Sequence, residues 1–504
     1  MAPPTFEFDF QTTGGNFTGK VAFSAGLFIN NEFVESVEGS TVELVNPTDG
    51  KPLGHVSAAT DKDIDIAVKA AREAFEQRWG TKVPPPERAR LIHRLADLVE
   101  QHADELAALE SLNNGKTVFV SRFVDVQGFV NTLRYYAGWA DKIHGKTIEV
   151  NDAKFAYTRH EPIGVVGQII PWSVLGMFAW KIPPALATGN TIVIKPSEWT
   201  PLTAIRVAAL AKEAGFPKGV LNVVTGLGSV AGAAISSHMD IDKVAFTGST
   251  LVGRHILKSA AASNLKKVTL ELGGKSPSII FDDADLDKAV SWAAFGIVFN
   301  HGQTCSAGSR VYVHEKIYDE FLLKFTEKLK SLKVGNPFAP DTFQGPQASE
   351  TQFKRIMGYI ESGKKDGATL HLGGSQHGTE GFFIEPTIFT DVKPDMKIMR
   401  EEIFGPVVVV AKFSNDEEAV RLANDTLYGL AAGIFTKDIS RAIDVSNKLK
   451  SGTVWINEFN KVEVTLPFGG YKQSGIGREL GEYALQNYTE VKAVHINLSA
   501  TPPI

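Results

Sequence analysis

Short apolar runs alternate with helix-like stretches over most of the chain after Gly164, and no other feature constrains the fold as strongly. One helix-like stretch, Pro201–Ala214, ends at Gly215, and glycine often follows the last turn of a helix. Strand–helix–strand alternation of this kind predicts a parallel, doubly wound α/β sheet. The first set of predicted strands comprises Val165–Ile170, Thr191–Ile194, Leu221–Val224, Val244–Phe246 and Val268–Leu270, with further helices over Val230–Ser237 and Thr250–Ala262.

A second alternating set begins at Ser278 and predicts a second α/β domain. A chain of 504 residues is too long for one hydrophobic core, so two such domains agree with its length. The predicted strands of the second set are Ser278–Phe281, Val311–Val313, Val407–Val410, Gly433–Phe435 and Val454–Asn457. Its predicted helices are Asp285–Phe295, Lys316–Leu332, Asp416–Asn424 and Ile439–Leu449.

The N-terminal part predicts an irregular arm over residues 1–50 that leads into short strands at 27–29 and 41–45. Thr60 and Asp63 have the spacing of a capping box at the start of a helix. Pro86 favours the start of a longer helix that continues through Leu112 and stops at Asn113-Asn114-Gly115.

Two further segments, Lys154–Arg159 and Tyr488–Asn497, alternate polar and apolar residues like edge strands. Unpaired strand edges promote aggregation, so we predict that both segments pair with another subunit. Simple surface strands are the alternative.

The composition argues against several classes of partner. A net charge of -5 offers no electrostatic reason to bind nucleic acid or an anionic membrane, and no apolar run is long enough to span a bilayer. The first 20 residues carry Glu7, Asp9 and Lys20 and no apolar core, so we expect no signal peptide. The low cysteine content permits a reducing compartment, and we expect a cytoplasmic location.

Cys305 is the only cysteine in the chain. It can form no internal disulfide and belongs to no cysteine-rich zinc site, so it is either an inert buried thiol or a nucleophile. Small and polar residues flank it, and Gly302 and Gly308 allow the backbone to approach a ligand closely. This setting favours an accessible, reactive thiol.

Three segments follow predicted strands, at the edge where α/β folds bind ligands. Residues 246–253, including Gly248 and Ser249, would open a helix whose free N–H groups can receive a phosphate, although a structural turn is the alternative. Glu198 would accept hydrogen bonds from ribose hydroxyls, with Lys195 as a donor, and its charge would repel a 2′-phosphate. A solvated Lys/Glu pair is the alternative there.

Glu271 ends a predicted strand and precedes Gly273 and Gly274. Partial burial would raise its pKa toward that of a general base, whereas an exposed structural carboxylate is the alternative. Residues 273–276 are not a P-loop, because Thr269 stands where that motif requires glycine. The sequence predicts no metal site and no Ser-His-Asp hydrolase.

Together these segments resemble the NAD(P)-dependent aldehyde dehydrogenase superfamily, and the resemblance covers residues 27–497. The segments that carry it are 195–198, 246–253, 271–277, 302–310, 401–406 and 467–472. The resemblance implies a Rossmann-type NAD-binding domain over 1–145 and 163–272, a catalytic domain over 273–480, and a small β oligomerisation arm over 146–162 and 481–504. It further implies a homo-oligomer, a dimer or a tetramer.

The resemblance also implies residue roles. Cys305 would attack the aldehyde as a thiolate, and Glu271 would activate the water that hydrolyses the resulting thioester, while Glu479 would relay protons. Coenzyme contacts are implied for Trp172, Lys195, Glu198, Gly248, Ser249, Glu402 and Phe404, with NAD favoured over NADP. An apolar substrate channel is expected to include Val174, Met177, Trp180, Phe299 and Phe468, although a core role is the alternative for each.

Ser173 marks a departure from the family pattern. The family has an asparagine there, whose amide stabilises the oxyanion together with the backbone N–H of the cysteine, and the stretch from Ser173 to Trp180 is one residue short. Losing one oxyanion donor costs about 2.7–4 kcal/mol, or roughly 10²–10³ in rate. The serine hydroxyl can donate a hydrogen bond but is shorter, so either the loop re-forms and another donor serves, or turnover is slow. Three functions stay open: an NAD-dependent aldehyde dehydrogenase, a catalytically weak NAD-binding or structural member of the family, and a thiol esterase.

Overall fold

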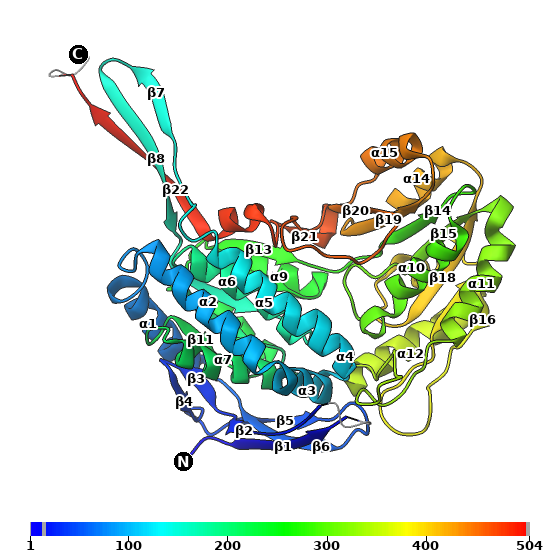
Figure 1. The fold of residues 1–504 in the computed structure, drawn as a ribbon, viewed down its shortest axis with the longest axis horizontal. Helices are drawn as coiled ribbons and strands as arrows, with labels where there is room; N and C mark the ends of the chain where they lie inside the picture. Colours follow the sequence, from blue (N-terminus) through cyan, green and yellow to red (C-terminus); the bar gives the residue numbers. More distant parts are fainter. Residues whose placement is uncertain (1, 13–16, 500–504) are drawn as a thin grey trace.

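The computed structural model describes residues 2–12 and 17–499 and contains two large sheets and a projecting arm (Figure 1). The first sheet has a parallel core with helices on both faces. Alternate residues of its strands enter two different cores: Val166 and Ile192 pack with α2, α5, α6 and α7, whereas Val165 and Val193 pack with α1 and α8. The parallel strands, in spatial order, are β13 (Lys267–Glu271), β12 (Lys243–Thr247), β9 (Val165–Ile169), β10 (Thr191–Lys195) and β11 (Leu221–Val223).

Short antiparallel strands extend the first sheet at both ends. The strand β21 (Gly475–Ile476) pairs with β13, and β3 (Leu27–Ile29) with β4 (Glu32–Val34) continues the sheet beyond β11. The helices around this sheet are α1 (Asp61–Gln77), α2 (Pro85–Gln101), α3 (Ala103–Asn114), α5 (Gln127–Ala137), α6 (Val174–Ala187), α7 (Leu202–Ala214), α8 (Ala233–Ser237) and α9 (Thr250–Ala262). The short α4 (Val118–Val120) and a π-helical turn, Ser121–Val126, precede α5.

The second sheet is parallel except at β16, which pairs antiparallel with β17. In spatial order its strands are β16 (Thr369–Leu372), β17 (Thr387–Thr390), β18 (Val407–Phe413), β15 (Arg310–His314), β14 (Pro277–Ile280), β19 (Ala431–Phe435) and β20 (Thr453–Ile456). Its helices are α10 (Leu286–Val298), α11 (Tyr318–Lys330), α12 (Glu350–Lys365), α13 (Lys397–Arg400), α14 (Asp416–Asn424) and α15 (Ile439–Lys448).

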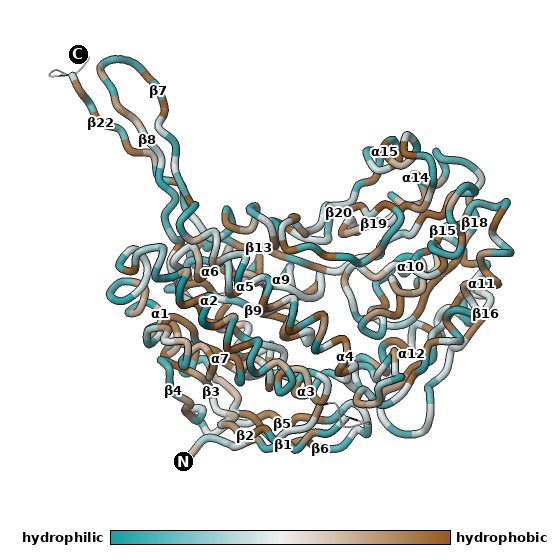
Figure 2. Tube along the Cα trace, in the orientation of Figure 1, coloured by the Kyte–Doolittle hydropathy of each residue, from teal (hydrophilic) through white to brown (hydrophobic). Residues whose placement is uncertain are grey.

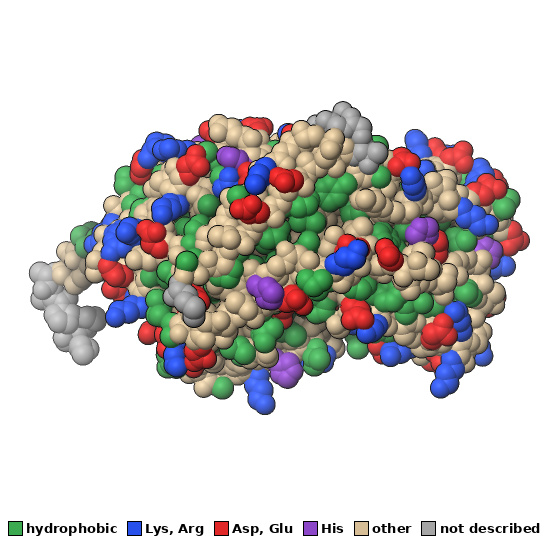
Figure 3. All heavy atoms as spheres, turned by 90° about the horizontal axis from the view of Figure 1, so that it is seen from below, with side chains coloured by type: hydrophobic (Ala, Val, Ile, Leu, Met, Phe, Trp, Pro, Cys, Tyr) green, Lys and Arg blue, Asp and Glu red, His purple; other side chains and the backbone are tan. Residues whose placement is uncertain are grey.

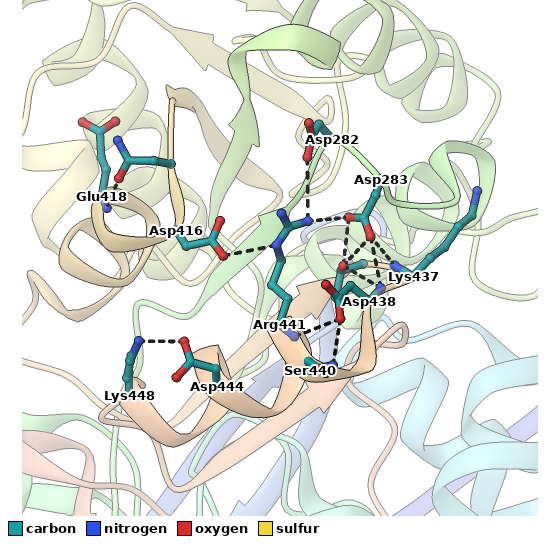
Figure 4. A network of polar contacts seen from close by, with 12 residues as sticks. Asp282, Asp283, Asp416, Glu418, Lys437, Asp438, Ser440, Arg441, Asp444 and Lys448 are labelled. Carbon is teal, nitrogen blue, oxygen red and sulfur yellow. Dashed lines mark hydrogen bonds and ion pairs between the residues drawn. The ribbon is translucent and has the colours of Figure 1, made fainter.

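One guanidinium ties α14 and α15 to the loop after β14 (Figure 4). Arg441 on α15 lies 3.0 Å from Asp283 and 3.1 Å from Asp416, which opens α14. The Asp283 carboxylate also accepts a bond from the Thr436 hydroxyl at 2.8 Å. These contacts hold α14 and α15 against the loop that follows β14.

The arm consists of β7 (Thr147–Asn151), β8 (Lys154–Pro162) and β22 (Thr489–Asn497), and it projects from the body (Figure 1). The two segments predicted to pair with another subunit pair with each other, in antiparallel register from Thr489↔Pro162 to Asn497↔Lys154. Because β8 has a strand on each side, the prediction that it pairs with another subunit is wrong, whereas for β22 it stays a prediction. Among the described residues, the spatial order β22-β8-β7 leaves one edge of β22 and one edge of β7 unpaired.

Three other expectations need correction. The described part of residues 1–50 is not an irregular arm, because β1 (Thr5–Gln11) and β2 (Thr18–Ser24) pair antiparallel and pack with β5 (Thr41–Val45), β6 (Pro52–Ser57) and α3. The helix predicted from Pro86 to Leu112 breaks at His102, whose backbone leaves the helical region and whose ring lies 2.7 Å from Glu105. No element was predicted for 118–137 or 350–365, where helical structure forms.

Several predicted boundaries agree with the structure. The helices α9 and α14 have the predicted bounds, α7 ends at Gly215 in the left-handed region, and Asp63 bonds the Thr60 backbone N–H at 2.8 Å. The residue ranges of the three predicted domains stay a prediction, and they include residues outside the described part of the chain. The strand β21 lies within residues 273–480, which were predicted to form the catalytic domain, but it pairs with the first sheet.

The surface offers no single-sign charge cluster on the face shown in Figure 3, where acidic and basic side chains are interspersed. No helix in the described part of the chain is both long and apolar enough to cross a membrane.

Candidate active site

The strand order of the first sheet places the predicted site residues along one edge. From β9 the chain adds β10 and β11 on one side and then β12 and β13 on the other, so the order reverses between β9 and β12. Ligands of doubly wound folds bind at the carboxyl ends of the strands beside such a reversal. The residues at or just after those ends are Trp172 and Ser173, Lys195, Gly248 and Ser249, and Glu271.

Lys195 and Glu198 form a fixed pair at the end of β10. The Lys195 ammonium lies 3.1 Å from one Glu198 oxygen, and the Gly228 backbone N–H donates to the other at 3.2 Å. Burial lowers the pKa of Lys195, against the opposite effect of Glu198. The pair therefore presents a positioned carboxylate with lone pairs available to hydroxyl groups.

Ser249 caps α9, with its side chain accepting a bond from the Val252 N–H at 3.3 Å. The first turn of α9 thus lies at the reversal point, where backbone N–H groups of a helix N-terminus favour an anion. Beside it, the buried Thr247 hydroxyl has no hydrogen-bond partner in the described part of the chain. An open helix terminus and an orphaned buried hydroxyl fit the phosphate and sugar groups of a dinucleotide.

Glu402 and Phe404 approach the same region from the second sheet. The Gly274 N–H donates to Glu402 at 3.0 Å, and a Cβ at Gly273 would collide with the Glu402 carboxylate. Burial raises the pKa of Glu402 to about 7. The Trp172 and Phe404 rings meet edge to face at 5.5 Å, which joins the segment after β9 to the second sheet.

Cys305 lies in the connection from α10 to β15 and is partly exposed. Its backbone carbonyl abuts Gly274, where any side chain would collide with it, so the thiol is held beside the strand end that carries Glu271. Burial raises the pKa of the thiol well above its usual value, and the Glu271 carboxylate raises it further. Burial therefore opposes ionisation of the Cys305 thiol, and a thiolate at this position needs a base to take its proton.

Glu271 is 2% exposed, and burial raises its pKa to about 8, against smaller lowering effects of Cys305 and Lys181. Neither carboxyl oxygen has a partner of normal hydrogen-bond geometry in the described part of the chain. The exposed structural carboxylate considered from the sequence is therefore excluded. A buried carboxyl beside a thiol can take a proton from it or from a water molecule.

The helix α6 divides the predicted channel residues between two faces. Ser173, Met177 and Trp180 have helical spacing and are partly exposed, whereas Val174 is fully buried in the core below the first sheet. The prediction that Val174 lines a channel is wrong, because its side chain is fully buried in the core together with Leu175 and Phe178.

Trp180 meets Phe468 edge to face at 5.0 Å, and Trp180 and Cys305 pack against the same apolar cluster, which contains Phe468. Phe299 is partly exposed and contacts Phe295 instead, with ring centroids 4.9 Å apart.

The sequence analysis missed two polar residues near this site. Lys181 is fully buried and forms an ion pair with Glu479. Asn300 donates to the Ser173 hydroxyl at 3.2 Å. The sequence offers two signals, a lysine within an apolar helix and an Asn-His-Gly turn. Neither signal identifies the residue that the polar side chain contacts. No group of three or more His, Cys, Asp or Glu side chains among the described residues could hold a metal ion.

Comparisons with known proteins agree on one family. The model of the aldehyde dehydrogenase family matches residues 33–494. An aldehyde dehydrogenase of Emericella nidulans is 62% identical over 94% of this chain and 95% of its own, and one of Agaricus bisporus is 58% identical over 96% and 97%. The NAD+ complex of an aldehyde dehydrogenase from Bacillus cereus superposes with a TM-score of 0.93 at 53% identity, covering 94% of this chain and 96% of that one.

Proposed function

The chain belongs to the aldehyde dehydrogenase family, and we propose that it oxidises an aldehyde to the carboxylic acid, with NAD as the hydride acceptor. Family membership makes it an aldehyde dehydrogenase that uses NAD or NADP. The roles of single residues, the preference for NAD and the substrate class are the proposal.

Cys305 is the nucleophile in this proposal, and Glu271 is the base. Glu271 takes the thiol proton, and the sulfur then forms a bond to the aldehyde carbon, giving a thiohemiacetal. Loss of hydride from that carbon leaves a thioester on Cys305. Glu271 then releases the thiol proton to solvent and removes a proton from water, whose oxygen adds to the thioester carbon. The C–S bond breaks, the acid leaves, and Glu271 returns its proton to the sulfur.

Bound NAD or NADP supplies the acceptor for the hydride. Lys195 and Glu198 are proposed to hold the adenine-side ribose, and the α9 terminus at Gly248 and Ser249 the pyrophosphate. Glu402, Phe404 and Trp172 are proposed to position the nicotinamide half. The negative charge of Glu198 disfavours a 2′-phosphate, which supports NAD over NADP.

One observation carries the mechanism: the Glu271 carboxyl is buried without a partner for either oxygen among the described residues, at the strand end beside which Gly274 holds Cys305. Burial of an unpaired carboxyl is costly and is found where function requires it. Met177, Trp180 and Phe468 further support aliphatic or aromatic aldehydes as substrates.

Replacing the nucleophile tests this function directly. Cys305→Ala should lower NADH formation from a panel of aldehydes at least ~10³-fold, because no covalent adduct can form. The dissociation constant of NAD, measured by fluorescence titration, should stay within about threefold. NADH formation that survives this change would remove the mechanism.

A catalytically weak, coenzyme-binding protein is the second candidate, favoured by Ser173 and by the raised pKa of the Cys305 thiol. NAD binding without NADH formation from any aldehyde in the panel would support it.

A further inference from the structure

Ser173 occupies a firmly held position at the start of α6. The preceding carbonyl, that of Trp172, accepts two hydrogen bonds, from the Asn114 amide at 2.5 Å and from the Thr200 hydroxyl at 3.1 Å. The Ser173 carbonyl accepts the first helical bond, from the Met177 N–H at 3.0 Å. The backbone of Ser173 is thus fixed on both sides.

The Ser173 hydroxyl does not cap its own helix. Serine at this position usually accepts a bond from the second or third helical N–H, but the Ser173 side chain makes no such bond. The buried carboxyl of Glu110 on α3 faces the Leu175 N–H in the first turn of α6 instead. This contact lowers the pKa of Glu110, against the larger opposite effect of burial. The Ser173 hydroxyl is therefore available for another contact.

That contact is with Asn300, five residues before the thiol in the same connection. The Asn300 amide nitrogen lies 2.8 Å from the Gln303 carbonyl oxygen and 3.2 Å from the Ser173 hydroxyl. A carbonyl can only accept, so the NH₂ group must face Gln303. The same NH₂ group then donates to Ser173, whose oxygen is the acceptor and whose hydrogen remains free to donate.

Asn300 does not depend on Ser173 for its place. Its φ of 50° lies in the left-handed region, which asparagine tolerates better than most residues, and its side chain is buried. The Gln303 side chain accepts a bond from the Ala348 N–H at 3.1 Å, which anchors the turn. The amide is thus preorganised before any substrate arrives.

We propose that Asn300 is a positioning residue that holds the Ser173 hydroxyl as a hydrogen-bond donor to the oxygen that becomes negative when Cys305 attacks a carbonyl. The inference rests on the proposed function, since it needs a tetrahedral adduct on Cys305. Ser173 shares its helix face with Met177 and Trp180, and its hydroxyl contacts Asn300, which lies in the same connection as Cys305. A serine held in this way replaces the longer amide side chain of the family pattern.

A double-mutant cycle tests the proposal. Ser173→Ala should lower the pre-steady-state rate of NADH formation roughly 10²-fold or more, as loss of an oxyanion donor does, and Ser173→Thr should restore most of that rate. Asn300→Gly tolerates the positive φ and adds no charge, and it should slow the same step about 10-fold or more, because the hydroxyl is no longer oriented. In the Ser173→Ala background, Asn300→Gly should change the rate less than about twofold.

Asn300→Asp provides a second variant, because aspartate also tolerates the backbone conformation but its carboxylate can only accept. It would draw the Ser173 hydrogen toward itself, so the rate should fall at least as far as in Asn300→Gly, with the NAD dissociation constant within about twofold of the parent. Additive effects of Ser173→Ala and Asn300→Gly, or a normal rate in Asn300→Gly, would overturn the positioning role while leaving the proposed function intact. Activity in Cys305→Ala would instead end the proposed function.

Discussion

Glu271 shows how burial tunes a single side chain for chemistry. A carboxyl in water has a pKa near 4.3, and burial raises that of Glu271 to about 8. The folded chain therefore holds the Glu271 proton more tightly than the unfolded chain, so this residue disfavours folding increasingly as pH rises from about 4 to 8. Such shifts are typical of functional sites, where a group must exchange protons near neutral pH.

Glu271→Gln should separate the two halves of the reaction. The amide cannot take a proton from water, so the steady-state rate should fall at least ~10²-fold. A burst of NADH should persist at high pH, where part of the Cys305 thiol ionises without the help of Glu271. In the parent the steady-state rate should rise as Glu271 loses its proton and level off above about pH 8. Stopped-flow and steady-state profiles between pH 6 and 9.5 check both points, and a variant with the turnover of the parent would contradict the assignment.

At the scale of elements, α6 combines three functions in one helix. One face is buried in the core through Val174, Leu175 and Phe178, and the other carries the partly exposed Met177 and Trp180. Between them Lys181, fully buried, pairs with Glu479 from the segment after β21. The ion pair therefore joins α6 to a segment almost 300 residues later in the chain.

Glu479→Gln should destabilise the protein by about 3–5 kcal/mol, because it leaves the Lys181 charge buried without its partner. Combining it with Lys181→Met should recover much of the loss, since the uncompensated charge is then removed. Asp444→Asn is the matched control: its partner Lys448 lies 2.6 Å away on exposed α15, where such a pair contributes about 0.5 kcal/mol or less (Figure 4). Urea-denaturation midpoints, measured at one protein concentration, check this prediction. Equal midpoints for Glu479→Gln and Asp444→Asn would contradict it.

At the scale of the whole molecule, the candidate site lies where the two sheets meet, and the arm projects away from both (Figure 1). The connection that leads from Glu271 at the end of β13 to β14 also contacts the backbone of Cys305. The arm carries hydrophobic as well as polar segments (Figure 2), and its apolar side chains Ile148, Val150, Phe155 and Val491 are exposed. Unpaired strand edges bearing such residues favour association.

We therefore predict a homo-oligomer, a dimer or a tetramer, in which the arm contacts another subunit. Val150→Asp combined with Val491→Asp should shift the mass measured by light scattering toward the monomer, because charges would be buried in the interface. Leu323→Asp, on the equally exposed surface of α11, should leave the mass unchanged. A parent protein that is monomeric at micromolar concentration would contradict the prediction.

The sequence by itself determined most strands and several helix ends, because apolar periodicity, capping residues and C-terminal glycine act over a few residues, as in α9 and α14. It also indicated Cys305, a lone cysteine among small and polar residues, and Glu271 and Glu198, which lie at or just after strand ends. Helices such as α12 were missed, because their polar faces weaken the apolar pattern.

Only the tertiary structure decided which groups meet. The direction in which Val174 points depends on the start and rotation of α6, and the pairing of β8 with β22 brings together segments more than 300 residues apart. The contact of Asn300 with Ser173 spans 127 residues. The high pKa values of Cys305 and Glu271 likewise arise from burial, which depends on the packing of the whole chain around a side chain and not on its neighbours in the sequence.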